Sequence, residues 1–242
     1  MKASSAPLKP QRVMGIVAHP DDLDVSAAAS IAKYIQQGAE VEYLILTDGG
    51  KGSDDQSMTT ERLIQTRQDE QRAALVALGG VAENVHFLPY PDGELELTMG
   101  LKRDIVREIR RFRPDTVITL DPTVIYSQQT GRINHPDHRA AGQAVLDAVF
   151  PLARDRLMFP ELIAEGLEPH NVTTVLLVDF DRATYYEDVT STFHLKEEAI
   201  NAHPSQFADA SYVMDIFRTM AQRLGEKAGC EMAEGFVRLD IR

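Results

Sequence analysis

The sequence predicts an α/β fold with a mostly parallel sheet, on the basis of buried strand patterns, intervening helical patterns and their alternation. Short runs rich in Val, Ile and Leu are typical of strands buried on both faces. Five such runs occur, at Arg12–Val17, Val41–Thr47, Val85–Leu88, Thr116–Leu120 and Thr173–Val178. Helical patterns separate them, which indicates βαβ units with helices on both faces of the sheet. The predicted class is therefore Rossmann-like.

The predicted helices between the strands have clear ends. They cover Asp24–Gln37, Thr59–Leu78, Thr98–Phe112 and Pro136–Phe150. Gly38 and Gly79 follow the first two, and glycine commonly closes a helix. The third stops before Pro114, because the residue that precedes a proline disfavours helical backbone.

The chain after the fifth strand has a different pattern. Asp179–Thr192 is polar and irregular, whereas Ser191–Ala202 and Ser205–Lys227 have helical spacing. With no linker, repeat or low-complexity segment, we expect residues 1–242 to form a single domain with a C-terminal helical extension. Met1–Gln11 has no apolar stretch of the kind found in secretory signals, and is expected to be a flexible N-terminal arm.

Composition excludes several classes of function. The single cysteine, Cys230, rules out an internal disulfide and a cysteine-based zinc site. The formal net charge is −12, and the one dense basic run, Arg103–Arg113, is interpreted as a solvated helix face. Nucleic acid is therefore not an expected partner. No apolar stretch is long enough to insert into a membrane, so a cytoplasmic protein is expected.

Two His/Asp clusters follow predicted strands. Ala18–Asp22 follows the first strand. His135–His138 follows the long loop Asp121–Asn134, which begins after the fourth strand. Ligands collect at the carboxyl ends of parallel strands, which meet at one edge of the sheet. One His-Pro-Asp sequence can arise by chance, and an aspartate at a helix start, such as Asp24, is usually only a cap. Two clusters at two strand ends favour a metal site.

The residue types in these clusters suit a catalytic metal ion. Zinc binds imidazole and carboxylate groups, and a catalytic site has three protein ligands and one open position. His19 and Asp22 are close enough to share a tight turn, and His138 can supply the third ligand. Asp21 and His135 then remain, one as general base and the other as acid or oxyanion stabiliser.

The chain resembles the LmbE/PIG-L family of metal-dependent N-deacetylases, which includes deacetylases of mycothiol, bacillithiol and GPI-anchor synthesis. The two clusters match the family's Ala-His-Pro-Asp-Asp and His-Pro-Asp-His motifs. Further matches are Thr66-Arg67-x-x-Glu70, Leu88-x-x-Pro91-Asp92-Gly93, His203-x-Ser205-Gln206 and Ala233-Glu234-x-Phe236. The resemblance therefore runs over nearly the whole chain.

The resemblance implies a role for each residue of the two clusters. His19, Asp22 and His138 match the metal ligands. Asp21 matches the general base, and His135 matches the residue that stabilises the oxyanion and protonates the leaving amine.

Three other expectations concern the surroundings of these residues. Asp137 is expected to orient a histidine, and the family places Arg67 and Asp92 near substrate hydroxyl groups. Some members have a tyrosine that assists the oxyanion where this chain has Ile133, and Tyr126 in the same loop is a candidate substitute.

The expected function is zinc-dependent removal of an N-acetyl group from an amino-sugar or a small glycoside conjugate. Two alternatives stay open: an amidase that cleaves a larger thiol-sugar conjugate, and a non-catalytic metal- or sugar-binding protein. A site of two histidines and one carboxylate also accepts Fe²⁺. The expected partner is a small N-acetylated molecule, and the family's trimers and hexamers suggest a homo-oligomer. Gly49–Gly52 lacks the spacing of a phosphate-binding loop, so nucleotide binding is rejected.

Overall fold

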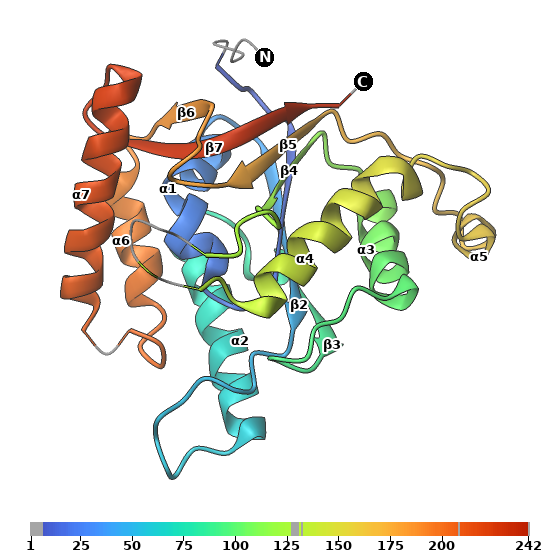
Figure 1. Ribbon diagram of the computed structural model, residues 1–242, viewed down its shortest axis with the longest axis horizontal. Helices are drawn as coiled ribbons and strands as arrows, with labels where there is room; N and C mark the ends of the chain where they lie inside the picture. The colour runs from blue at the N-terminus through green and yellow to red at the C-terminus, as the bar shows by residue number, and fades with distance from the viewer. Residues whose placement is uncertain (1–6, 127–130, 132, 208, 242) are drawn as a thin grey trace.

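The structure is a computed structural model that describes residues 7–126, 131, 133–207 and 209–241 (Figure 1). Its sheet has seven strands in the order β3-β2-β1-β4-β5-β7-β6. They are β1 Arg12–Val17, β2 Glu40–Thr47, β3 Val85–Tyr90, β4 Thr116–Leu120, β5 Thr174–Val178, β6 Tyr185–Asp188 and β7 Ala233–Asp240. Strands β1 to β5 are parallel, while β7 runs antiparallel to both of its neighbours.

Helices cover both faces of this sheet, which confirms the predicted fold class. They are α1 Asp22–Gln36, α2 Thr60–Ala77, α3 Met99–Phe112, α4 Pro136–Asp147, α5 Pro160–Ala164, α6 Phe193–Asn201 and α7 Ala210–Ala228. Figure 1 shows α1, α2, α6 and α7 on one side of the sheet, with α3 and α4 on the other. Within the described part of the chain, no helix has the length and apolar character needed to cross a membrane.

Close packing holds α1 and α4 against the central strands. A Cβ atom added to Gly15 of β1 would lie 2.4 Å from Cδ1 of Leu23, so α1 begins directly against that strand. A Cβ atom on Gly142 of α4 would lie 2.3 Å from the carbonyl oxygen of Leu120 at the end of β4. Helices α1 and α4 therefore lie directly against β1 and β4.

Two strands near the C-terminus were not predicted. The segment Asp179–Thr192, expected to be irregular, contains β6, and β7 follows the last helix. Both strands contain buried glutamates, Glu187 and Glu234, which lie within hydrogen-bond distance of lysines. Such strands have no uninterrupted apolar run, so a search for apolar runs misses them.

Several predicted boundaries differ from the structure. Helix α7 begins five residues later than expected, because the chain turns after His203 through backbone hydrogen bonds from Gln206 and Phe207. Helix α4 gives way to a π-turn, and Phe150 has extended backbone (φ −144°, ψ 122°) before Pro151. That is the conformation that a following proline favours.

Two other expectations concern the N-terminal arm and the basic run of α3. Residues 1–6 of the expected N-terminal arm lie outside the described residues, but Leu8 donates its backbone N–H to Tyr185 and Pro10 is buried. The basic run of α3 is not wholly solvated, because Arg110 is only 2% exposed. Its guanidinium donates to backbone carbonyls of Leu152, Ala153, Asp155 and Met158.

Candidate active site

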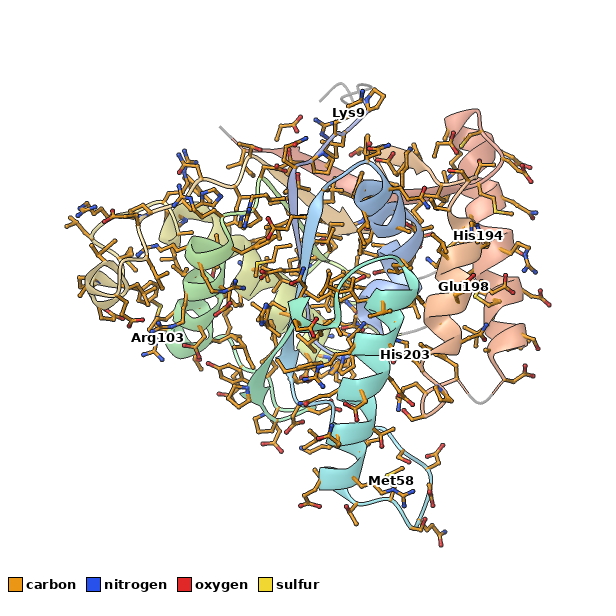
Figure 2. The ribbon with its side chains drawn as sticks, turned by 180° about the vertical axis from the view of Figure 1, so that it is seen from behind. Lys9, Met58, Arg103, His194, Glu198 and His203 are labelled. Atoms are coloured by element: carbon orange, nitrogen blue, oxygen red, sulfur yellow. The ribbon has the colours of Figure 1, made fainter. Side chains whose placement is uncertain are left out.

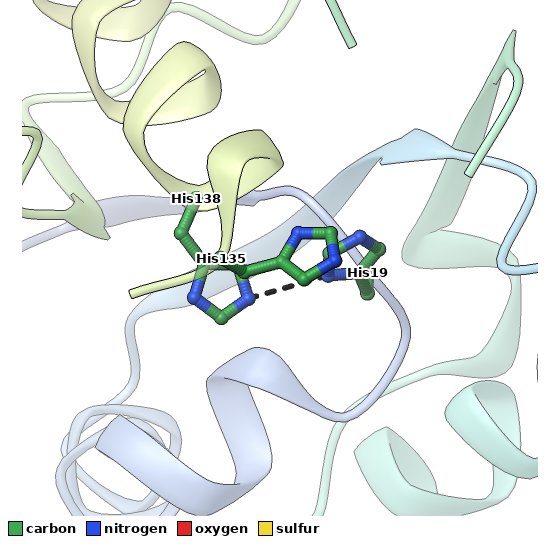
Figure 3. Close-up of side chains that lie close together, drawn as sticks. All are labelled: His19, His135 and His138. Carbon is green, nitrogen blue, oxygen red and sulfur yellow. Dashed lines mark hydrogen bonds between the residues drawn. The ribbon is translucent and has the colours of Figure 1, made fainter. Parts of the chain in front are cut away.

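The two His/Asp clusters meet where the strand order of the sheet reverses. Strands β1 and β4 are neighbours at the centre, and the helices that follow them, α1 and α4, lie on opposite faces. Open α/β sheets bind ligands at this kind of position, outside the carboxyl ends of the strands. His19 follows β1, whereas His135 and His138 lie at the start of α4, and their rings lie together (Figure 3).

Three side chains bring atoms that can bind a metal ion close to one point in this site. The distance from His19 Nδ1 to His138 Nε2 is 3.3 Å. Asp22 has one carboxylate oxygen 3.1 Å from His138 Nε2 and the other 3.6 Å from His19 Nδ1. Tetrahedral ligands at zinc bond lengths near 2.0–2.1 Å are separated by about 3.3 Å. The three groups therefore fit a single divalent cation.

Hydrogen bonds fix which nitrogen of each histidine faces that point. His19 Nε2 lies 3.1 Å from Asp137 and 3.2 Å from Asp92, whose carboxylates can only accept. His138 Nδ1 lies 3.1 Å from the side-chain oxygen of Asn134. Both contacts hold a ring proton on the outer nitrogen, so His19 Nδ1 and His138 Nε2 are the nitrogens that a cation would bind, in place of a second ring proton.

The charges around His19 also favour a cation. Burial lowers the pKa of this imidazole, but hydrogen bonds to Asp137, Asp22 and Asp92 outweigh burial and raise it to about 12. His19 also belongs to two groups of side chains close enough to hold a metal, one with Asp92 and Asp137 and one with His135 and His138. The protein thus concentrates carboxylates around a centre that requires positive charge.

Asp21 does not act as an ordinary helix cap. It occupies the N-cap position of α1, yet its side chain makes no capping hydrogen bond. Its backbone is left-handed, with φ 91° and ψ −27°, and its side chain is 16% exposed. Burial and the charge of Asp22 raise the pKa of the Asp21 carboxyl to about 7, against the opposing charge of Arg67.

His135 is the exposed neighbour of His19, Asp22 and His138, which together form the candidate ligand cluster. Its Nδ1 accepts the backbone N–H of Asp137, which leaves the proton on Nε2. Its ring meets that of His19 edge-on at a centroid distance of 4.8 Å. Burial and the neighbouring charge of His19 lower the pKa of His135, so its imidazole is neutral and offers an N–H donor.

Arg67 and Asp92 reach the site but are engaged with protein groups. Arg67 is 4% exposed and donates to the carbonyl oxygens of Gly49 and Pro20. Asp92 accepts the backbone N–H of Lys51 and lies 3.5 Å from Arg67. The loop Gly49–Gly52 packs closely against the turn that contains Pro20, since a Cβ on Gly49 would lie 2.9 Å from Pro20 Cδ.

The loop before α4 is only partly described. Tyr126 and Ile133 form an isolated antiparallel bridge, and Ile133 is 81% exposed. Residues 127–130 and 132 lie outside the described residues. Asn134 flanks the His-Pro-Asp-His motif, which makes it a candidate substrate contact, but the sequence does not show that its side-chain oxygen lies 3.1 Å from His138 Nδ1.

The other missed residues form a buried network behind Asp21. Asp24 was expected to be only a cap, but its carboxylate accepts from the side chains of Gln71 and His203. Figure 2 places His203 at the end of α6, beside α2. His203 lies in the His-x-Ser-Gln match, but that pattern does not indicate which side chain it contacts.

Known N-deacetylases resemble this chain over much of its length. Residues 14–149 match the family model PIG-L, described as GlcNAc-PI de-N-acetylase. Diacetylchitobiose deacetylase of Thermococcus kodakarensis is 32% identical over 227 residues, which cover 93% of this chain and 82% of that protein. Mycothiol S-conjugate amidase of Streptomyces coelicolor is 30% identical over 169 residues, covering 62% of this chain and 55% of that protein.

A solved structure agrees over the whole fold. The structure of N,N'-diacetylchitobiose deacetylase from Pyrococcus horikoshii, complexed with its inhibitor MPG, has a TM-score of 0.87 and 30% identity. The match covers 96% of this chain and 84% of that chain. Because the family model matches more than half of this chain, the chain belongs to the PIG-L family of N-deacetylases.

Proposed function

We propose that this protein is a zinc-dependent hydrolase that removes the N-acetyl group from an amino-sugar or a small glycoside conjugate. The observation that carries the proposal is the convergence of His19, Asp22 and His138 beside a carboxylate, Asp21, that serves no capping role. Hydrolysis adds water across the amide C–N bond and releases acetate and a free amine.

His19 Nδ1, His138 Nε2 and the Asp22 carboxylate would hold the metal ion. When bound, a divalent cation supplies a Lewis acid that polarises an amide carbonyl and makes water more acidic. Zinc suits two imidazoles and one carboxylate, and Fe²⁺ suits the same set. Asp22 is held for this task by the backbone N–H of His19, which donates to its carboxylate.

Asp21 would act as the general base. A base works best when its pKa lies near the working pH, because it must accept a proton and then return it. The Asp21 carboxylate adjoins the ligand cluster and its pKa is raised toward neutrality by burial and by Asp22. It would take the proton of the attacking water.

His135 would stabilise the oxygen that gains negative charge. Its Nε2 proton is free of the contact with Asp137, which occupies Nδ1. A neutral N–H donor beside the metal ligands can stabilise the oxyanion by a hydrogen bond. The same proton would be available for the leaving amine.

Asp137, Asp92 and Asn134 would orient the ligands rather than hold the metal. Each contacts the outer nitrogen of a ligand histidine, which sets the ring position and its tautomer. Contact of Arg67 and Asp92 with substrate hydroxyl groups stays a prediction. So do a cytoplasmic location and a homo-oligomeric state.

The test of this mechanism is Asp21→Asn in purified protein. Zinc content should hold, because Asp21 is not among the three ligands, while acetate release from N-acetylated amino-sugars should fall by roughly 100- to 10,000-fold. Asp69→Asn is the matched control, since Asp69 is an exposed aspartate of α2. Full activity in Asp21→Asn would overturn the assignment.

A substrate panel separates the remaining alternatives. The likeness to mycothiol S-conjugate amidase favours testing a larger thiol-sugar amide beside simple acetylated sugars. Preference for the larger amide would indicate the amidase. Stoichiometric zinc without acetate or amine release from any amide would indicate a non-catalytic binding protein.

A further inference from the structure

Two side chains of α2 hold opposite ends of one peptide bond beside the ligand cluster. Arg67 Nη2 donates to the carbonyl oxygen of Pro20 at 2.9 Å. Gln71 Oε1 accepts the backbone N–H of Asp21 at 2.8 Å. These two backbone atoms belong to the same peptide unit. Arg67 and Gln71 are four residues apart, so they project from one face of the helix.

The amide of Gln71 has a single workable orientation. Its Nε2 donates to Asp24 Oδ2 at 2.6 Å, and His203 Nε2 lies 2.8 Å from the same oxygen. A carboxylate only accepts hydrogen bonds, so the NH₂ end of Gln71 must face Asp24 and the carbonyl end must face Asp21. Gln71, Asp24 and His203 are all 0% exposed, so water does not replace these partners.

This arrangement holds Asp21 in a strained backbone conformation. A φ of 91° is unfavourable for any residue with a Cβ atom. Relaxation to a negative φ would require the Pro20–Asp21 peptide to rotate. Rotation would turn its carbonyl toward the Gln71 carbonyl and its N–H toward the Arg67 guanidinium, which opposes like groups at both ends. Arg67 and Gln71 therefore select the orientation that is observed.

We propose that Arg67 and Gln71, supported by Asp24 and His203, form a peptide clamp that aims the Asp21 carboxylate at the reacting centre. Gln71 and His203 are then positioning residues, which act through Asp21 and do not touch substrate. The inference rests on the proposed function in that Asp21 is taken as the base. A network that served folding alone would have no reason to hold this backbone away from its relaxed conformation.

The first test is Gln71→Met, which keeps the length of the side chain and removes both polar ends. The clamp predicts a fall in kcat of roughly 100-fold with little change in KM or zinc content, because misplacement of a base affects the chemical step. Gln65→Met is the matched control, since Gln65 lies on the exposed face of the same helix. An unchanged kcat in zinc-loaded Gln71→Met would overturn the proposal.

A polarity reversal tests the clamp without deleting it. Gln71→Glu alone opposes two carboxylates and should lose activity. With Asp24→Asn added, the new amide can donate to the new carboxylate, which still accepts the N–H of Asp21, and to His203 Nε2 in its other tautomer. The kcat of the double variant should be at least tenfold higher than that of Gln71→Glu, because the two positions are coupled. No recovery would contradict the network.

A third measurement is independent of catalysis. Glycine tolerates positive φ and alanine does not, so Asp21→Gly should melt at a higher temperature than Asp21→Ala. In the Gln71→Met background one of the two contacts that hold the peptide is lost, so this gap should narrow. An equal gap in both backgrounds would overturn the clamp. If the gap narrows but neither the wild-type protein nor any variant hydrolyses an amide, the proposed function fails while the clamp stands.

Discussion

Asp137→Asn would test how the carboxylate behind His19 supports the metal site. Asp137 Oδ2 accepts from Gly93 N–H at 2.7 Å and lies 3.1 Å from His19 Nε2. Its other oxygen, Oδ1, accepts from Leu95 N–H at 3.2 Å. An asparagine has one accepting oxygen, so in either orientation its NH₂ group faces at least one buried N–H donor.

The magnitude follows from these contacts. If the new amide keeps its oxygen toward His19 and Gly93, the Leu95 N–H loses its partner, which costs about 1–3 kcal/mol of folding stability. For a chain of this length that lowers the melting temperature by roughly 2–12 °C. Under the proposed set of metal ligands, loss of the carboxylate behind His19 should also weaken zinc binding by about 10- to 100-fold.

Competition for zinc with a chelating dye would measure the affinity, and calorimetry would measure the melting temperature. Asp69→Asn is the matched control, because Asp69 is an exposed aspartate of α2. If Asp137→Asn kept both the zinc affinity and the melting temperature of the unmodified protein, the assignment of this carboxylate to His19 would be refuted.

Three further predictions concern stability. Lys196→Met would leave the buried Glu234 without its charged partner, 2.7 Å away, and should cost about 3–5 kcal/mol, measured by urea denaturation. Burial lowers the pKa of His203, but Asp24 outweighs it and raises the pKa above 6.5. Protonated His203 therefore stabilises the fold fully below pH 6.5, and this contribution is lost as the pH rises through the raised pKa. The protein should be less stable at about pH 9 than at about pH 6, and the difference should be smaller in His203→Gln. Gly142→Ala should lower stability by about 1–3 kcal/mol, because the added methyl would lie 2.3 Å from a backbone carbonyl oxygen, and an unchanged melting temperature would contradict the packing argument.

The predictable part of the fold follows from local patterns. The strands β1 and β4 have the predicted bounds, because an apolar run buried on both faces is visible in the sequence itself. Strands β6 and β7 were missed because their buried polar residues are stable only through distant partners. Glu187, for example, accepts from Lys33 and Tyr34 of α1, more than 150 positions away.

The candidate site divides in the same way. The sequence by itself identified the candidate site residues, because His19, Asp21, Asp22 and His138 lie in two compact motifs at strand ends, where the fold class brings ligands together. Only the tertiary structure decided how Asp21 is held. Its backbone N–H meets a side chain 50 positions away, and the network ends at His203, 179 positions from Asp24. Hydrogen bonds of this kind depend on helix packing across the folded protein, and no local pattern encodes them.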